Sequence, residues 1–372
     1  EALAALTPRC PVVAFPVGRT EIGTFARSHT GNLMGSHALT SAALAQAGAV
    51  VVDSPTAAID AVRALRHGRL APKADPGVGL LTGQAGPGLA IVDRLNVARV
   101  RVPEIAAGTQ ATIAGLLPPL TFMKNPVDTG RPDASFGRVC AALGSDPAID
   151  AVLVYALYEH GSSDPVGGIA EGRQSFDKPV LFGTGGTPAE IGPLAEASEA
   201  AGVGCYDSPD RVAAGMIALV DDARAQWRLR ARDESAGAAK VPDVPRGALD
   251  EVAAKAVAAA LGIGVPRSKV APDREMAHAA LDDLAPPVAV KVLNPAVLHK
   301  TEAGGVHLGV STAAQLDDAV SGIEAIPGGP HRFLIEEMAA PGLELILGGR
   351  RDPSWGPSVL VGLGGTAAEA LG

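Results

Sequence analysis

The sequence predicts an α/β fold in which short apolar strands alternate with helices. Apolar runs of strand length, such as 78–82 and 151–155, lead into turn residues that are followed by helical patterns. Glycine and proline are abundant (45 and 30 residues) although 47% of the chain is hydrophobic, which indicates an aliphatic core bounded by many tight turns. The pattern Ala-Gly-x-x-x-x-Asp-Ser-Pro occurs twice, at 47–55 and 201–209. We therefore expect two related, doubly wound subdomains.

The first subdomain is predicted at residues 1–71. Its expected elements are a strand at 11–17, a loop at 18–35, a helix at 36–46, a strand at 49–52 and a helix at 56–65. Asp53, Ser54 and Pro55 supply a capping side chain and a first-turn proline for the last of these helices.

The second subdomain is predicted at residues 76–232, after a short linker that contains proline and lysine. Its expected elements are strands at 78–82, 151–155, 180–182 and 203–206, a glycine-rich turn at 83–88 that leads into a helix, and a further helix at 189–201.

A third unit is predicted at residues 248–372, because a linker rich in charge, alanine, glycine and proline occupies 233–247. Its expected elements are a helix at 249–261, strands at 288–292, 332–336, 343–347 and 359–362, and a loop rich in glycine and histidine at 294–305. Two or three domains also agree with a length of 372 residues.

Composition excludes several classes of protein. A formal net charge of −9 and only 12 aromatic residues argue against nucleic-acid binding. The long uncharged stretch at 28–52 is too rich in small and polar residues to span a membrane. The three cysteines, Cys10, Cys140 and Cys205, form no CxxC pair, so neither a disulfide framework nor a zinc site is expected. A reducing, cytoplasmic compartment fits this usage best.

Ser28, His29, Thr30 and Gly31 form the first candidate site. The neighbours of His29 supply hydroxyl and backbone N–H donors just before a predicted helix, a setting that suits an imidazole carrying a phosphoryl group. A loop histidine that only caps the next helix explains the same four residues, and from them alone it is the favoured alternative.

The glycine-rich turn at 83–88 is a second candidate. Gly86 and Gly88 allow backbone amides to approach an anion at the start of a helix. Tight packing between strand and helix explains these glycines equally well. Asn125 to Asp128 is a weaker candidate, because these residues indicate a turn with an aspartate that caps a helix.

The third unit carries a candidate nucleotide site. Lys291 lies inside an apolar strand, where an unpaired lysine is costly. His299 and Lys300 follow, and then come the remaining members of the pattern, which are Gly304, Gly305, Glu336, Glu337 and Glu344. In this reading the lysines neutralise phosphates, the glycines cover them and the glutamates hold ribose and adenine edges. The alternative is an edge-strand lysine with surface glutamates.

These motifs together resemble those of the NDP-forming (ADP-forming) acyl-CoA synthetases, the acetate–CoA ligase relatives of succinyl-CoA synthetase. Besides the candidates above, the resemblance covers Gly18 to Glu21, Arg350 to Pro353 and Gly362 to Gly365, in one consistent order along the chain. It implies two flavodoxin-like ligase subdomains followed by an ATP-grasp domain.

The resemblance also implies roles for residues. His29 is expected to be the phosphoryl carrier, with Ser28, Thr30, Gly31, Gly86 and Gly88 at the phosphate. The nucleotide is expected at Lys291, Lys300, Gly304, Gly305, Glu336, Glu337 and Glu344. His299 matches a histidine that some members are thought to use as a second phosphoryl relay.

The implied reaction converts a carboxylic acid, coenzyme A and ATP reversibly into acyl-CoA, ADP and phosphate, through an acyl phosphate and a phosphohistidine. ATP or ADP, Mg²⁺ and coenzyme A are the implied cofactors and substrates. The implied partners are small molecules, with a homo-oligomer left open.

The resemblance further leads us to expect a segment of a longer protein. A CoA-binding domain and the carboxylate that orients the phosphohistidine would precede Glu1, and the metal ligands would follow Gly372, so the segment is expected to be inactive alone. Two other readings remain: a regulatory, acyl-CoA-sensing module of a protein acetyltransferase, and an ATP-grasp ligase that joins a carboxylate to an amine. An intact His29 argues against the first, and the twin flavodoxin-like units argue against the second.

Overall fold

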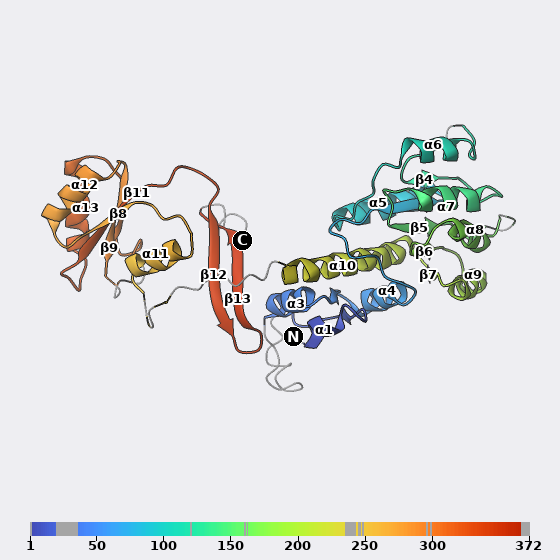
Figure 1. Ribbon diagram of the computed structural model, residues 1–372, viewed down its shortest axis with the longest axis horizontal. Coiled ribbons are helices and arrows are strands. Elements are labelled where there is room, and N and C mark those ends of the chain that lie inside the picture. Colours follow the sequence, from blue (N-terminus) through green and yellow to red (C-terminus); the bar gives the residue numbers. More distant parts are fainter. Residues whose placement is uncertain are drawn as a thin grey trace. The chain divides into compact units, whose positions relative to one another are not determined.

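The computed structural model describes residues 2–19, 36–119, 121–159, 161, 163–234, 243, 244, 247, 249–294, 297 and 300–365 (Figure 1). The chain divides into two compact units, of which unit 1 comprises residues 1–236 and 349–359 and unit 2 comprises residues 237–348 and 360–372. We describe each unit by itself. The finer domain boundaries expected from the sequence stay predictions.

Unit 1 begins with a small α/β segment. Its elements are α1 (Ala2–Leu6), β1 (Val13–Ala14), α3 (His37–Gln46), β2 (Val50–Val51) and α4 (Pro55–Leu65). Strands β1 and β2 pair in parallel, Val13 opposite Val50. Ser54 caps α4, because its side chain accepts a hydrogen bond from the backbone N–H of Ala57 at 3.1 Å. The predicted order strand, helix, strand, helix is confirmed here, although both strands are shorter than the apolar runs that predicted them. Helix α1 was not predicted, and residues 20–35 of the predicted loop at 18–35 lie outside the described residues.

A five-stranded parallel sheet follows in unit 1, with the strand order β4-β3-β5-β6-β7. Its strands are β3 (Val78–Thr82), β4 (Val127–Asp128), β5 (Ala151–Tyr155), β6 (Val180–Gly183) and β7 (Gly204–Tyr206). Its helices are α5 (Ala85–Val97), α6 (Ala107–Ala114), α7 (Phe136–Ser145), α8 (Pro165–Gly172), α9 (Pro188–Ala200) and α10 (Pro209–Glu234), with a short 3₁₀ turn at Arg173–Ser175.

Both faces of this sheet are buried. Leu153 and Tyr155 of β5 belong to one hydrophobic core cluster, together with residues of α4, α5 and α10. Val152 and Val154 point to the opposite face, because side chains alternate along a strand, and they pack with residues of α7 and α8. The unit is therefore doubly wound, as the sequence predicts.

The repeated nine-residue pattern takes the same form in both places. Gly48 and Gly202 follow α3 and α9 with positive φ angles of 89° and 70°, the left-handed conformation that ends many helices. A strand comes next, β2 or β7, and then a serine caps the following helix. In the second copy Ser208 accepts a hydrogen bond from the backbone N–H of Arg211 at 3.3 Å.

Asn125 completes the edge of the sheet beside β3. Its side-chain oxygen accepts a hydrogen bond from the backbone N–H of Leu80 at 2.9 Å. Its side-chain nitrogen donates to the backbone oxygens of Val78 at 2.8 Å and Pro103 at 2.9 Å. Strand β4 pairs with β3 only from Leu81 onward, so this amide replaces a neighbouring strand over the earlier residues.

Unit 2 is built on an antiparallel sheet with the strand order β10-β9-β11-β8. Its elements are α11 (Glu251–Ala260), β8 (Ser268–Ala271), α12 (Arg274–Asp283), β9 (Val288–Leu293), β10 (Val306–Val310), α13 (Ala313–Glu324) and β11 (Arg332–Glu337). A separate two-stranded sheet consists of β12 (Leu345–Asp352) and β13 (Gly356–Leu363), of which residues 349–359 belong to unit 1 and the others to unit 2. Val290 and Phe333 belong to a core cluster of this unit alone, shared with α12 and α13.

The predicted α/β class is confirmed in both units. No helix among the described residues is long and apolar enough to cross a membrane.

Candidate functional site

Lys291 is the central residue of a charge cluster in unit 2. It lies in β9 between Val290 and Val292, both fully buried. Its ammonium group donates hydrogen bonds to Glu251 Oε1 at 2.7 Å and to Glu336 Oε2 at 2.6 Å. The lysine that looked costly in an apolar strand is therefore paired with two carboxylates.

Glu251 gathers three lysines around one carboxylate. It is the first residue of α11, which Asp250 caps by accepting from the backbone N–H of Ala253 at 2.8 Å. Besides Lys291, its Oε1 accepts from Lys255 Nζ at 2.9 Å, and its Oε2 accepts from Lys300 Nζ at 2.9 Å. Lys255 also pairs with Glu336. The cluster thus holds three lysines and two glutamates, which leaves one net positive charge.

The cluster shifts the pKa values of its members. Burial alone raises the pKa of Glu251, but the hydrogen bonds from Lys291, Lys255 and Lys300 outweigh burial and lower the pKa from 4.5 to about 2. Burial alone lowers the pKa of Lys291, but its hydrogen bonds to Glu251 and Glu336 outweigh burial and raise the pKa. Both groups are therefore charged near neutral pH.

A cavity of about 640 Å³ opens beside this cluster. Its lining combines the polar residues Glu251, Lys291, Lys300, Thr301 and Glu302 with the apolar residues Val306 and Leu308. The volume lies in the range of small-molecule sites. The cavity therefore offers ammonium groups and aliphatic side chains to the same ligand. Such a lining suits a ligand with an anionic part and an apolar, planar part.

Gly305 fixes the loop that carries Lys300. A Cβ atom at Gly305 would lie 2.5 Å from Val292 Cγ1 and 3.1 Å from the backbone oxygen of Lys300, so only glycine fits this approach. The backbone N–H of Gly305 donates to the Lys300 oxygen at 2.7 Å, and the Gly305 oxygen accepts from the backbone N–H of Val292 at 2.8 Å. Gly304 has a φ of 71°, which also favours glycine.

The two adjacent glutamates of β11 face different surroundings. Glu336 is buried in the lysine cluster. Glu337 accepts hydrogen bonds at 3.0 Å from Arg267 Nη1 and from the backbone N–H of Ala285. Glu344 precedes β12, and its backbone oxygen accepts from the backbone N–H of Gly364 at 2.8 Å. Within the described ranges, no hydrogen bond or ion pair joins Glu337 or Glu344 to the three lysines.

Glu251 and Lys255 were not among the residues predicted from the sequence. Their spacing of four places them on one face of a helix, where a glutamate and a lysine commonly pair. That spacing is a signal in the sequence, but it does not reveal that the same carboxylate also reaches Lys291 and Lys300.

Gly86 and Gly88 lie in the first turn of α5 in unit 1. Gly86 has open space where a Cβ would be, whereas a Cβ at Gly88 would lie 2.9 Å from Thr82 Cγ2. Gln84, which precedes the helix, donates from Nε2 to Glu159 Oε1 at 3.1 Å. This helix start therefore lies beside the carboxyl ends of β3 and β5, where doubly wound folds bind ligands.

The remaining predicted site residues, Ser28, His29, Thr30, Gly31 and His299, lie outside the described residues. Within the described ranges, no group of three or more His, Cys, Asp or Glu side chains is arranged to hold a metal ion. The carboxylates of Glu251 and Glu336 are bonded to lysines instead.

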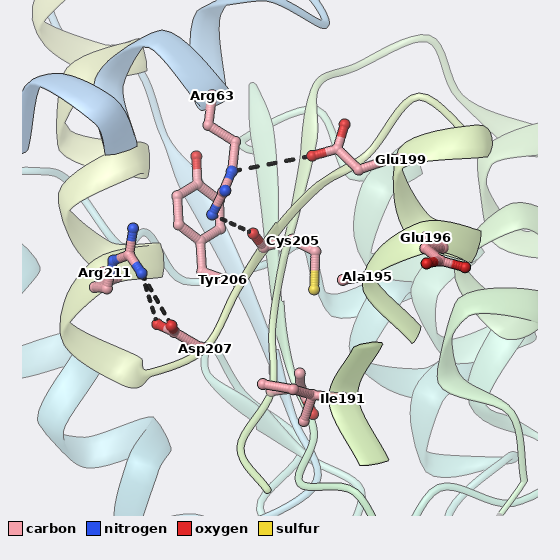
Figure 2. A pocket seen from close by; sticks show the side chains of 10 residues that line it. Arg63, Ile191, Ala195, Glu196, Glu199, Cys205, Tyr206, Asp207 and Arg211 are labelled. Atoms are coloured by element: carbon pink, nitrogen blue, oxygen red, sulfur yellow. Dashed lines mark hydrogen bonds and ion pairs between the residues drawn. The ribbon is translucent and has the colours of Figure 1, made fainter. Parts of the chain in front are cut away.

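Unit 1 has a second cavity, of about 540 Å³, at the carboxyl ends of β6 and β7 (Figure 2). Arg63 of α4 enters it, where its guanidinium lies 5.6 Å from the centre of the Tyr206 ring and donates to the backbone oxygen of Cys205 at 3.0 Å. Arg63 also forms an ion pair with Glu199, and Arg211 forms one with Asp207. Sequence reasoning missed this cavity, because its lining at residues 184–211 is completed by Arg63, which lies far away in the chain.

Comparison with protein families identifies domains at both ends of the chain. Residues 240–372 match the ATP-grasp domain, which includes the lysine cluster. Residues 1–65 match the succinyl-CoA ligase-like flavodoxin domain.

Among characterised proteins, the chain is similar to acid–CoA ligases. It is 28% identical to the trans-feruloyl-CoA synthase FCS1 of an unknown prokaryotic organism, over 97% of this chain and 53% of that protein. It is also 28% identical to the ADP-forming 4-hydroxybutyrate–CoA ligase of Nitrosopumilus maritimus (strain SCM1), over 97% of this chain and 54% of that protein. The chain thus spans about half the length of the curated relatives it matches.

A similar solved structure is the acetyl-coenzyme A synthetase 1 of Ca. Korarchaeum cryptofilum in complex with phosphate and ADP. The TM-score is 0.57 at 25% identity, over 62% of this chain and 50% of that chain.

Proposed function

Because this chain belongs to the family of the ADP-forming acyl-CoA synthetases, we propose that it supplies the nucleotide and phosphoryl-transfer parts of such an enzyme. The whole protein would convert a carboxylic acid, coenzyme A and ATP into acyl-CoA, ADP and phosphate. The characterised relatives are ligases, which does not favour the alternative of a regulatory module.

The convergence of Lys291 and Lys300 on one cavity carries this proposal. Their ammonium groups meet at a single carboxylate, at 2.7 and 2.9 Å, and both residues line the cavity beside it. Two cations held at such close range suit the successive phosphates of a nucleotide. Val306 and Leu308 offer an apolar surface to the rest of the ligand.

His29 is the proposed phosphoryl carrier between the nucleotide and the acid. A ring nitrogen of imidazole can take up a phosphoryl group near neutral pH, and the phosphoramidate bond is labile enough to pass the group on. The acid is proposed only as a carboxylic acid, because the relatives' names include both aromatic and aliphatic acids.

Phosphorylation of the full-length protein tests this function. With ATP labelled in the γ-phosphate and Mg²⁺, we expect the protein to take up a label that is stable in alkali and lost in acid. His29→Ala should abolish the label. His278→Ala is the control, because His278 lies on α12 and pairs with Asp317, and this variant should label normally. Labelling of the His29→Ala protein at the wild-type level would refute the assignment.

A further inference from the structure

We propose that Glu251 is a positioning residue that holds the ammonium groups of Lys291 and Lys300 together for the phosphates of a nucleoside diphosphate or triphosphate. This inference rests on the proposed function, because it concerns the same cavity. It adds a residue of α11 to a site that the sequence places on the sheet and its loops.

The geometry of the carboxylate supports this role. Each of its oxygens serves a different element, Oε1 bonding Lys291 of β9 at 2.7 Å and Oε2 bonding Lys300 of the following loop at 2.9 Å. One rigid, planar group therefore sets the separation of the two ammonium groups. Glu251 itself is fixed at the start of a capped helix, and its side chain is only 22% exposed.

The lysines differ in how much they depend on Glu251. Lys291 also has Glu336, at 2.6 Å, and so keeps an anionic partner without Glu251. For Lys300, Glu251 is the only ion-pair partner within the described ranges. Without that carboxylate, Lys300 would regain the rotamer freedom of a long side chain and would be repelled by the charge of Lys291. The phosphates would then have to order it again, which weakens their binding.

A binding experiment with two ligands separates positioning from general structural support. ADP and adenosine share the base and the sugar, but only ADP carries phosphates for the lysines. For Glu251→Gln we expect ADP to bind about tenfold more weakly than to the wild-type chain, with adenosine affinity unchanged. Isothermal titration calorimetry measures the dissociation constant of ADP, and ligand-observed NMR measures that of adenosine.

Glu275→Gln is the matched control. Glu275 lies in the first turn of α12, a helix of the same length as α11 that is likewise capped by an aspartate, Asp273. Within the described ranges, no ion pair involves Glu275. This substitution therefore removes the same first-turn charge without touching the lysines, and the affinity for ADP should not change.

The outcomes distinguish a positioning role of Glu251 from general structural support. Equal or tighter ADP binding by Glu251→Gln would overturn the inference, and so would an equal loss of ADP and adenosine affinity. A wild-type chain that binds no ADP would overturn the proposed function itself. If Glu251→Gln does not fold, Glu251→Asp decides, because it keeps the charge but withdraws it by one methylene. ADP binding by this variant that is several-fold weaker, with adenosine unchanged, supports the inference, and unchanged ADP binding refutes it.

Discussion

Two side chains in unit 2 show that the partners of a charged residue depend on which face of a strand it occupies. Glu336 and Glu337 are neighbours in β11, yet the first pairs with the two lysines Lys255 and Lys291, while the second accepts hydrogen bonds from Arg267 and from the backbone N–H of Ala285. The alternation of side chains along a strand is sufficient to separate them. Of these two adjacent glutamates, Glu336 is the one that bonds Lys291 of the cavity.

The depressed pKa of Glu251 predicts an acid-sensitive contribution to the stability of unit 2. The folded-state pKa is about 2 and the ordinary value is 4.5, so the stabilisation is complete above about pH 4.5 and is lost as the pH falls toward 2. The shift corresponds to about 3 kcal/mol at most. Urea unfolding from pH 6 to pH 2 should show the wild-type chain losing its advantage over Glu251→Gln across this window.

If the wild-type chain and Glu251→Gln differ in free energy of unfolding by the same amount at every pH, the pKa shift of Glu251 does not contribute to stability and this prediction is wrong. The Glu275→Gln variant should follow the wild-type curve.

At the scale of a whole helix, α5 shows two glycines with different reasons for being glycine. Gly88 allows the helix to pack on Thr82 at the end of β3, where a Cβ would lie 2.9 Å from Cγ2. Gly86, two residues earlier, has open space at the same position. Packing therefore accounts for Gly88, whereas no close neighbour of a Cβ accounts for Gly86.

Alanine substitutions in this helix should have opposite effects on stability. We expect Gly88→Ala to destabilise unit 1 by about 1–3 kcal/mol, because Thr82 must move. Gly86→Ala should stabilise it by up to about 1 kcal/mol, because alanine favours the helix. Chemical unfolding followed by circular dichroism measures both. A loss of stability in Gly86→Ala similar to that in Gly88→Ala would show that our description of the helix start is wrong.

Strands that are buried on both faces could be predicted from the sequence at their observed bounds. Val78–Thr82 and Ala151–Tyr155 are continuous apolar runs, and each is fully buried. Strands β8 and β10 escaped prediction because most of their residues are exposed or half-buried, so no apolar run marks them.

The candidate site could be predicted only in part, for a similar reason. Lys291 is conspicuous because a charge interrupts an apolar strand. Glu251 lies on a helix 40 residues away, and its contact with Lys291 exists only once the helix packs beside the sheet.

At the scale of the whole chain, the two units carry separate hydrophobic cores. Val290, Phe333 and their neighbours form a cluster within unit 2, and the two clusters around the parallel sheet lie within unit 1. Each unit therefore buries its own apolar surface, which is the physical requirement for unfolding as an independent cooperative transition.

Differential scanning calorimetry should accordingly show two transitions, of which ADP shifts only one. A ligand that binds only the folded state stabilises it by about 2.7 kcal/mol at a hundred times its Kd. We expect this shift in unit 2 alone, and Glu251→Gln should reduce it at the same ADP concentration. A single transition would contradict the independent unfolding of the two units, and an equal shift of both transitions would contradict the assignment of nucleotide binding to unit 2.

The side-chain amide of Asn125 has a consequence for how this protein behaves in concentrated solution. An outer strand whose main-chain groups are unpaired is a template to which an extended segment of another molecule can add. The amide already engages the N–H of Leu80 and the oxygen of Val78 on the open side of β3. An incoming chain would find those two groups occupied, so the part of β3 that β4 does not cover is a poor site for intermolecular strand addition.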